Sequence, residues 1–297
     1  MSKTNWTAQD LPRMDGRTVV VTGANSGLGL VTSRELARAG ARVVLAVRDT
    51  ERGAAAAREI GGVTEVRQLD LANLGSIREF ARRWSEPIDV LINNAGIMMV
   101  PEGRTADGFE RQFGTNHLGH FALANLLLPH LTDRVVTISS QAHRRGHIDL
   151  ADLNWNKRPY NPSGAYGQSK LANLLFTLEL QRRLTAAGST LRAVAAHPGW
   201  AATNLQKHTQ NPIADFAMSV GNKLIAQSAT AGALPTLFAA TQDLPPAAYI
   251  GPDGFYEYRG YPTLVGRSHA ASNPELAQKL WQQSEKLTGI IFSSLAI

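Results

Sequence analysis

Short apolar runs alternate along the chain with longer segments in which apolar residues recur every three or four positions. The apolar runs are rich in Val, Ile and Ala and predict buried strands at 17–23, 41–47, 63–71, 88–96, 133–140, 191–199 and 247–252. The periodic segments predict helices at 28–40, 50–60, 76–84, 116–131, 166–187 and 227–240. Such alternation is typical of a parallel sheet with helices on both faces. The pattern therefore predicts a doubly wound α/β fold of about seven strands, which binds ligands at the carboxyl ends of the strands.

No linker or change of composition divides the 297 residues, so we expect a single domain over 1–297. The segment 251–262 is rich in Gly, Pro and aromatic residues and fits no regular element. The chain contains no cysteine, which excludes a disulfide framework, a thiolate metal site and a thiol nucleophile. Its first residues are polar and its longest apolar run is too short to span a bilayer, so we expect a cytoplasmic protein without membrane contact.

The formal net charge is +6, and Lys and Arg are scattered along the chain. No basic run is interleaved with aromatic residues, so we expect no nucleic-acid partner. A mildly positive surface suits small anionic molecules, phosphates included. The histidines 117 and 120, and 143 and 147, stand at helical spacing, but no Asp or Glu at ligand spacing accompanies either pair. We therefore expect no metal site.

The first predicted strand runs directly into TGANSGLG (22–29), which precedes the first predicted helix. Glycine is needed where the backbone turns sharply and where a pyrophosphate must approach the main chain. The N-terminus of the helix offers free N–H groups and a partial positive charge to the phosphates. We interpret this segment as a dinucleotide-binding loop; a glycine-rich turn that binds nothing is the alternative.

The T-G-x3-G-x-G spacing of the loop, together with NNAG (93–96), Ser140 and YGQSK (166–170), resembles the classical short-chain dehydrogenase/reductase family. The resemblance covers residues 17 to about 250, with the motifs in the family's order. TNHLGHF, SKLANLLF and HPGW are most similar to the retinol dehydrogenase-like branch and its bacterial relatives. The resemblance implies a Rossmann-type fold and an oxidoreductase that interconverts a carbonyl compound and an alcohol with a nicotinamide cofactor.

The resemblance also implies which residues contact the cofactor. The pyrophosphate would lie on the glycine loop, the adenine beside the end of the third strand, the ribose after the fourth strand, and the nicotinamide after the sixth. The implied contacts are Gly23, Asn25, Ser26, Gly27, Leu28, Gly29, Asp70, Leu71, Asn94, Ala95, Gly96, Tyr166, Lys170, Pro198, Gly199 and Thr203. For Asp70, a helix cap or an ordinary surface residue is the alternative.

The end of the second predicted strand bears on the choice between NADP(H) and NAD(H). Enzymes that prefer NAD(H) place an acidic residue there, on the ribose 2′-OH, whereas here the position falls on Val47 and Arg48 follows. A guanidinium can bind a 2′-phosphate by charge-assisted hydrogen bonds, and a carboxylate would repel it. We therefore predict NADP(H) over NAD(H). A solvated Arg48, with Asp49 serving NAD(H), is the alternative.

Tyr166 and Lys170 stand four apart on one face of a predicted helix. An isolated phenol, with a pKa near about 10, exchanges its proton poorly at neutral pH, and a nearby cation favours the phenolate. We therefore expect Lys170 to lower the pKa of Tyr166, which would act as the general acid/base; a surface pair is the alternative. The resemblance implies that Ser140, rather than Ser139, polarises the carbonyl and that Asn116 holds a proton-relay water. For Asn116, a helix cap is the alternative.

The gap between Ser140 and Tyr166 exceeds the family's usual spacing, which predicts an insertion at about 141–163. We expect residues 201–225 to form a lid over a small apolar carbonyl or alcohol substrate. Family dimers pair the helices expected at 116–131 and 166–187, and the insertion could obstruct that face, so homodimer, tetramer and monomer all stay open. A catalytically silent NADPH-binding sensor is the alternative function, although such proteins usually lack the Tyr or the Lys.

Overall fold

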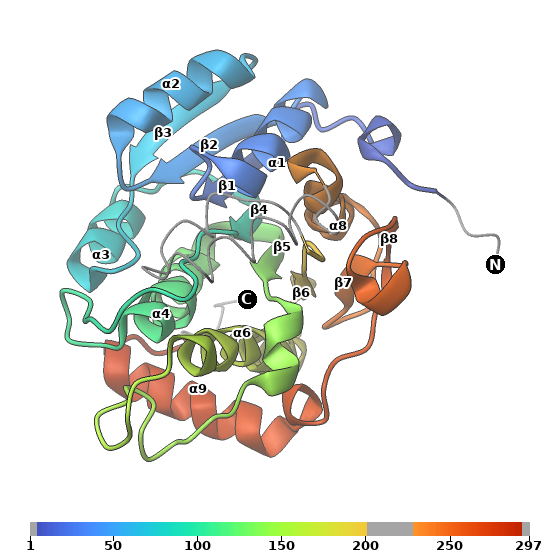
Figure 1. Cartoon of the computed structure of the whole chain (residues 1–297). Coiled ribbons are helices and arrows are strands. Elements are labelled where there is room, and N and C mark those ends of the chain that lie inside the picture. Colours follow the sequence, from blue (N-terminus) through green and yellow to red (C-terminus); the bar gives the residue numbers. More distant parts are fainter. Residues whose placement is uncertain (1–4, 201–227, 293–297) are drawn as a thin grey trace.

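The computed structural model describes residues 5–200 and 228–292, and within these residues the chain forms one sheet of eight strands (Figure 1). The order across the sheet is β3-β2-β1-β4-β5-β6-β7-β8. All neighbouring strands are parallel except β7 and β8. The strands are β1 Thr18–Thr22, β2 Arg42–Val47, β3 Thr64–Gln68, β4 Ile88–Asn93, β5 Leu131–Ile138, β6 Arg192–Ala196, β7 Tyr249–Pro252 and β8 Pro262–Leu264. The doubly wound α/β fold is confirmed.

Helices cover both faces of the sheet (Figure 1). One face carries α1 Gly27–Arg38, α2 Thr50–Ile60 and α8 Ala229–Thr241. The other carries α3 Leu74–Arg82, α5 Gly119–Leu127, α6 Pro162–Ala186 and α9 Pro274–Thr288. Successive strand residues point to opposite faces, so Val20 packs in one core while Val19 and Val21 pack in the other. Both cores are apolar, which explains why the strands read as nearly continuous apolar runs.

Two elements differ from the sequence-based expectation. β8, an antiparallel edge strand of three residues, begins at Pro262, the last residue of the segment 251–262, so the expected count of about seven strands is one too low. α9 is also absent from the predicted set, although its boundaries carry recognisable signals. Asn273 accepts a hydrogen bond from Leu276 N, Pro274 takes the first helical position, and Gly289 ends the helix with a φ of +64°.

The helix expected at 116–131 is less regular than its sequence suggests. It begins with the short α4 Arg111–Phe113, continues as a π-helical turn at Gly114–Leu118, and becomes α5 only at Gly119. A 3₁₀ turn at Leu128–His130 then leads into β5. Such π-helical turns occur frequently at functional sites, and this one contains Asn116.

α9 packs along α6 and also reaches α5 (Figure 1). Trp281 of α9 stacks on Phe176 of α6 with ring centroids 5.7 Å apart, and meets the edge of Phe121 of α5 at 4.8 Å. Aromatic pairs of this kind stabilise a helix interface beyond the area that they bury. A helix of the same chain therefore covers part of α5 and α6.

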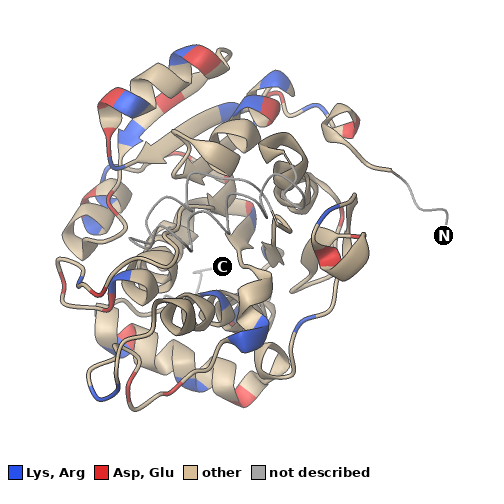
Figure 2. Ribbon diagram, in the orientation of Figure 1, with Lys and Arg blue, Asp and Glu red and all other residues tan. Residues whose placement is uncertain are grey.

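Charged residues of both signs alternate on the outer helices α2 and α3 (Figure 2). None of the helices built from the described residues has both the length and the apolar character that a membrane crossing requires.

Candidate active site

The carboxyl ends of the central strands are level with one another. The register pairs Thr22 with Ala46 across β1 and β2, and Ile138 with Ala196 across β5 and β6. The segments that follow these strands therefore meet at one edge of the sheet. The expected site residues within the described part of the chain come either from these segments or from the helical segments of Asn116, Tyr166 and Lys170.

The glycine loop after β1 has a backbone that only glycine adopts easily. Gly23 and Gly27 have φ values of +66° and +55°. A Cβ atom on Gly29 would lie 2.5 Å from the carbonyl oxygen of Gly23 and 2.5 Å from Asn94 Nδ2. Glycine is therefore required at all three positions for the loop to close against β4.

The N-terminus of α1 can receive an anion. Ser26 is the N-cap residue, its side chain makes no capping bond within the described residues, and the first turn from Gly27 contains no acidic side chain. The first N–H groups and the positive end of the helix dipole are thus free to bind phosphate. Asn25 and Leu28 lie in the same half-buried turn. The loop fits the pyrophosphate of a dinucleotide.

Thr22, which is fully buried, ties the end of β1 to the end of β4. Its hydroxyl oxygen accepts hydrogen bonds from Asn94 N and Ala95 N, both at 2.9 Å. Asn94 Nδ2 donates to Thr22 O at 2.7 Å. Gly96 follows, and a Cβ there would lie 3.2 Å from Asn116 Oδ1 and 3.5 Å from Lys170 Nζ. The backbone after β4 therefore runs directly past the expected catalytic side chains.

The residues expected to contact the adenosine half of the cofactor follow the ends of β2 and β3. Asp70 Oδ1 accepts from Ala72 N at 2.9 Å, and Leu71 is buried. Asn73 caps α3, so the helix-cap alternative for Asp70 is wrong. The role of Asp70 at the adenine stays a prediction.

Arg48 is the first residue after β2, and its side chain is exposed. The neighbouring Asp49 is the N-cap of α2 and accepts from Arg52 N at 3.0 Å. This carboxylate is thus already bonded to the helix that follows, whereas Arg48 is an exposed residue at the end of β2, the strand next to β1.

α6 begins with Pro162 in its first turn, capped by Asn161, which accepts from Gly164 N at 2.8 Å. This start places Tyr166 and Lys170 at the sheet edge, with Lys170 Nζ 5.7 Å from the Tyr166 ring centroid. Lys170 is 4% exposed, and its Nζ donates to Ile138 O at 3.1 Å.

The two serines after β5 differ in what they contact. Ser139 is buried and donates to Lys170 O at 2.8 Å, which fastens β5 to α6. Ser140 is half-buried and accepts from Ala142 N at 3.2 Å, and its side chain lowers the pKa of the Tyr166 phenol. Only Ser140 therefore has its hydroxyl beside the phenol.

Burial dominates the electrostatics of this site. It raises the pKa of Tyr166 to about 12, against a smaller lowering by the hydrogen bond with Ser140. Burial also lowers the pKa of Lys170 to about 8. The expectation that the charge of Lys170 lowers the pKa of Tyr166 is not met in this structure: burial raises this pKa, and the smaller lowering comes from Ser140. At neutral pH the phenol is protonated and the ammonium is charged.

Asn116 is buried inside the π-helical turn, so the helix-cap alternative is wrong. Its side chain bonds to both backbone groups of Ile97, accepting from the N–H at 2.8 Å and donating to the carbonyl at 2.9 Å. It also donates to Ser169 Oγ at 3.0 Å. Asn116 thus joins the segment after β4 to α6; the water that it is expected to hold stays a prediction.

The turn after β6 contains Gly199 with a φ of +66°. Gly199 N donates to His197 Nδ1 at 3.2 Å, and Pro198 lies between them. Thr203 and the expected lid at 201–225 lie outside the described residues.

The expected insertion starts with a 3₁₀ helix at Gln141–Arg145, and Ile148 and Leu153 bury their side chains in the core. His143 is fully buried, and its Nδ1 bonds to Ser140 O at 2.7 Å. Burial lowers the pKa of His143 to about 4, so the ring is neutral and packs as a structural residue.

Sequence reasoning missed several side chains that hold the site together, including Thr22, Ser169 and His120. His120 Nδ1 faces the carbonyl oxygen of Asn116 at 2.9 Å, so Nδ1 carries the ring proton and donates it. Nε2 is therefore an acceptor for the Thr22 hydroxyl proton at 2.9 Å, while the Thr22 oxygen accepts from two N–H groups. The only sequence signal for this chain of bonds is the four-residue spacing of Asn116 and His120.

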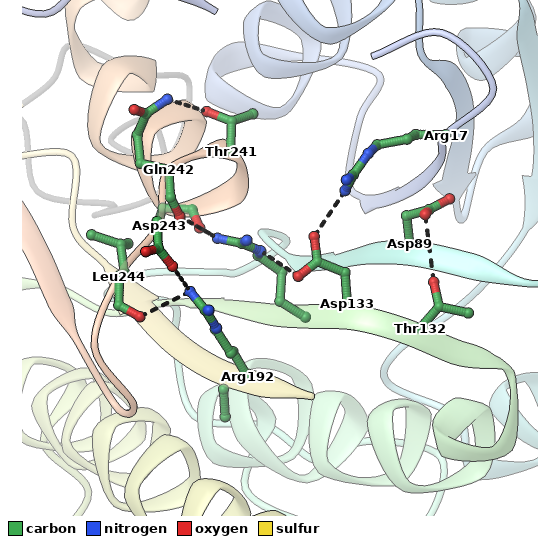
Figure 3. A network of polar contacts seen from close by, with 12 residues as sticks. Arg17, Asp89, Thr132, Asp133, Arg192, Thr241, Gln242, Asp243 and Leu244 are labelled. Atoms are coloured by element: carbon green, nitrogen blue, oxygen red, sulfur yellow. Dashed lines mark hydrogen bonds and ion pairs between the residues drawn. The ribbon is translucent and has the colours of Figure 1, made fainter. Parts of the chain in front are cut away.

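A cavity of about 570 Å³ lies at the opposite edge, where the strands begin (Figure 3). Its charged lining consists of Arg17, Asp89, Asp133, Arg134, Arg192 and Asp243. These groups bond to one another and to main-chain groups. The cavity is therefore a polar junction apart from the candidate active site.

Known proteins resemble this chain along most of its length. A family model described as short chain dehydrogenase matches residues 17–213. Retinol dehydrogenase 13 from Homo sapiens is 45% identical over 291 residues, which span 93% of this chain and 85% of that protein. The crystal structure of an uncharacterized protein from Mycobacterium Paratuberculosis is 58% identical, with a TM-score of 0.85 over 98% of this chain and 100% of that one.

A more distant solved structure contains a nucleotide. The RhlG/NADP active-site complex from Pseudomonas aeruginosa is 25% identical, with a TM-score of 0.61 over 77% of this chain and 90% of that one. The loop geometry, the phenol beside a buried ammonium and these relatives agree. The chain belongs to the short-chain dehydrogenase family, with retinol dehydrogenase-like relatives, and it is a nicotinamide-nucleotide oxidoreductase that acts on CH–OH donors.

Proposed function

We propose that the protein reduces a small apolar carbonyl compound, or oxidises the corresponding alcohol, with NADP(H) and with Tyr166 as general acid/base. The observation that carries the proposal is the meeting of Tyr166, Ser140 and Lys170 at the sheet edge beside the glycine loop. Asn116 completes the proposed catalytic set through its bonds to the segment after β4.

Each of these side chains has a defined task in the proposed reaction. The nucleotide, when bound, supplies or accepts the hydride. Tyr166 keeps its proton at neutral pH, since its pKa is raised to about 12, and can donate it to the oxygen that gains negative charge during reduction. The Ser140 hydroxyl donates a hydrogen bond to the same oxygen, and the Lys170 ammonium stabilises the negative charge that the phenol acquires.

The cofactor preference rests on the residues after β2. Arg48 is exposed and Asp49 is engaged in capping α2, which supports NADP(H) over NAD(H). We expect Arg48→Ala to raise the Kd for NADPH roughly tenfold or more, because a charge-assisted bond to the 2′-phosphate is lost, and to leave the Kd for NADH unchanged. Arg52→Ala is the matched control, since Arg52 is also exposed and lies in the first turn of α2. Equal effects on both cofactors would remove the proposed preference.

The apolar substrate, the oligomeric state and the cytoplasmic location also stay proposals. A relative named for retinol, an apolar alcohol, supports the substrate class. The cover that α9 gives to α5 and α6 supports a monomer, which sedimentation equilibrium can test. Fractionation of cells that express the chain tests the location.

The central test is NADPH oxidation with a panel of apolar aldehydes and ketones, for the wild type and for Tyr166→Phe. We expect turnover to fall by about 10³-fold in the variant, because the proton donor is lost, while NADPH binding persists. A wild type that binds NADPH and reduces no member of the panel would favour the silent sensor.

A further inference from the structure

We propose that Glu257 is a positioning residue, which clamps the turn after β6 to the turn after β5 and so sets the nicotinamide-binding turn against Ser140. The inference rests on the proposed function, and it assigns a task to the segment 251–262, for which the sequence predicts none.

Glu257 lies in a strained turn. Tyr256 and Glu257 have φ values of 49° and 57°, and two successive non-glycine residues in the left-handed region are costly. The turn buries little apolar surface that could offset this cost: the rings of Phe255 and Tyr256 meet edge to face with centroids 4.4 Å apart, but these residues are 81% and 70% exposed. Strain of this kind persists where the surrounding contacts hold it in place.

The Glu257 carboxylate provides such contacts, with partners on two separate turns. Oε2 accepts from Gln141 Nε2 and, at 2.9 Å, from His197 Nε2. Oε1 accepts from Arg144 at 3.4 Å. Gln141 and Arg144 follow Ser140 in the chain, whereas His197 directly precedes Pro198.

His197 has a fixed tautomer in this arrangement. Its Nδ1 accepts from Gly199 N at 3.2 Å, so Nε2 carries the proton and donates it to Glu257. The ring is fully buried and lies directly over Gly251, where a Cβ atom would collide with the imidazole. One bonded path therefore links the Glu257 carboxylate to the main chain of Gly199.

The backbone of the same segment also holds the turn after β6. Trp200 N donates to Tyr258 O at 2.8 Å, and a Cβ on Gly199 would lie 2.5 Å from that oxygen. β5 and β6 are neighbours, and Ile138 pairs with Ala196 at their ends. Glu257 thus fixes the separation of two turns that leave the sheet side by side.

The test compares Glu257→Ala and Glu257→Gln with Phe255→Ala, a change of an exposed side chain in the same turn. NADPH is titrated with each protein. The Kd and the nicotinamide fluorescence at saturation are recorded, followed by kcat and the thermal midpoint. Because the substitution leaves the glycine loop after β1 intact, the adenosine half of NADPH should still bind. We therefore expect Glu257→Ala to change the Kd for NADPH by less than about threefold. The nicotinamide fluorescence enhancement should disappear and kcat should fall by about tenfold or more, since small misplacements of reacting groups are costly.

Glu257→Gln can still accept from His197 and should recover part of the fluorescence and of kcat, and Phe255→Ala should match the wild type. The proposal would be overturned if Glu257→Ala kept the kcat and the nicotinamide fluorescence of the wild type. It would also be overturned if the Kd rose in proportion to the loss of kcat, because such a parallel loss indicates a merely structural role. If Glu257→Ala does not fold, Glu257→Gln is judged on the same criteria. A wild type that binds neither NADPH nor NADH overturns the proposed function itself, which the first titration reveals before any variant is made.

Discussion

The charged groups at the amino edge of the sheet, where the strands begin, are paired, whereas the lysine of the candidate active site is not paired with any residue that the structure describes. At the amino edge, Arg17 pairs with Asp133 at 2.9 Å and Arg192 pairs with Asp243 (Figure 3). Arg134 bonds to Asp133 and to two carbonyls near the end of α8. At the carboxyl edge, Lys170 is buried and makes no ion pair with any described residue. Paired charges join elements of the fold, whereas an unpaired buried charge costs stability and marks a functional site.

The sharpest test of this contrast is Lys170→Met. We expect kcat to fall by about 10³-fold, because the cation that stabilises the developing phenolate is gone. The same change should stabilise the fold at pH 7 by up to about 3 kcal/mol, since the pKa of Lys170 is lowered from 10.5 to about 8 by burial. Chemical denaturation and NADPH oxidation measure the two effects, with the exposed Lys279→Met as control. A variant that is both inactive and less stable would show that Lys170 is a structural residue.

Arg134→Met should give the reverse result. The side chain is 8% exposed and donates to Ala239 O at 3.1 Å and Gln242 O at 2.7 Å, so its loss removes the donor from both carbonyls and leaves Asp133 with Arg17 as its ion-pair partner. We expect the free energy of unfolding to fall by about 3 kcal/mol, because breaking a buried pair strands its partners. Arg13→Met, at a side chain that is 90% exposed, should leave the free energy of unfolding unchanged within experimental error. The kcat of folded Arg134→Met should equal that of the wild type. A reduced kcat would contradict the inference that Arg134 contributes to stability and not to catalysis.

The pH dependence of the free energy of unfolding measures the contribution of the buried, unpaired charge of Lys170. Since the pKa of Lys170 is lowered to about 8, the unfolded chain binds more protons than the folded chain between pH 8 and 10.5. This group therefore makes the free energy of unfolding rise with pH across that window, by about 2 kcal/mol between pH 8 and 10. Above pH 10 the raised pKa of Tyr166 acts in the opposite direction, because the unfolded chain then loses its phenolic proton first. Urea denaturation at several pH values measures the slope, which should vanish in Lys170→Met.

The sequence predicts the parts of the molecule that depend on local patterns. Apolar strands, helical periodicity and the glycine loop predict the fold, and they put most of the expected site residues at the carboxyl ends of the strands. Helical spacing puts Tyr166 and Lys170 on one face, but it carries no information on burial, and burial decides the direction of both pKa shifts. The contacts of Glu257 could not be predicted from the sequence for another reason. Its partners lie at least 60 positions away, and a left-handed Tyr-Glu pair has no glycine to announce it.

The smallest expected effect is that of Arg192→Met. It tests whether an ion pair at the amino edge contributes to stability because it is buried, rather than because it is paired. Arg192 also pairs with an aspartate and donates to Leu244 O at 3.1 Å, but Asp243 is 91% exposed and Arg192 itself is 35% exposed. Solvent screens such a pair and hydrates either partner when the other is removed, so Arg192→Met should lower the free energy of unfolding by less than about 1 kcal/mol. Arg134 and Arg192 stand on adjacent strands and face each other in the register, which makes the two variants a matched pair. Denaturation in low and high salt should show a salt-dependent loss for Arg192→Met and a nearly salt-independent one for Arg134→Met. If both variants lose the same stability, the exposure of an ion pair does not determine its contribution at this edge. Lys170 would then differ from these arginines only in having no ion-pair partner among the described residues.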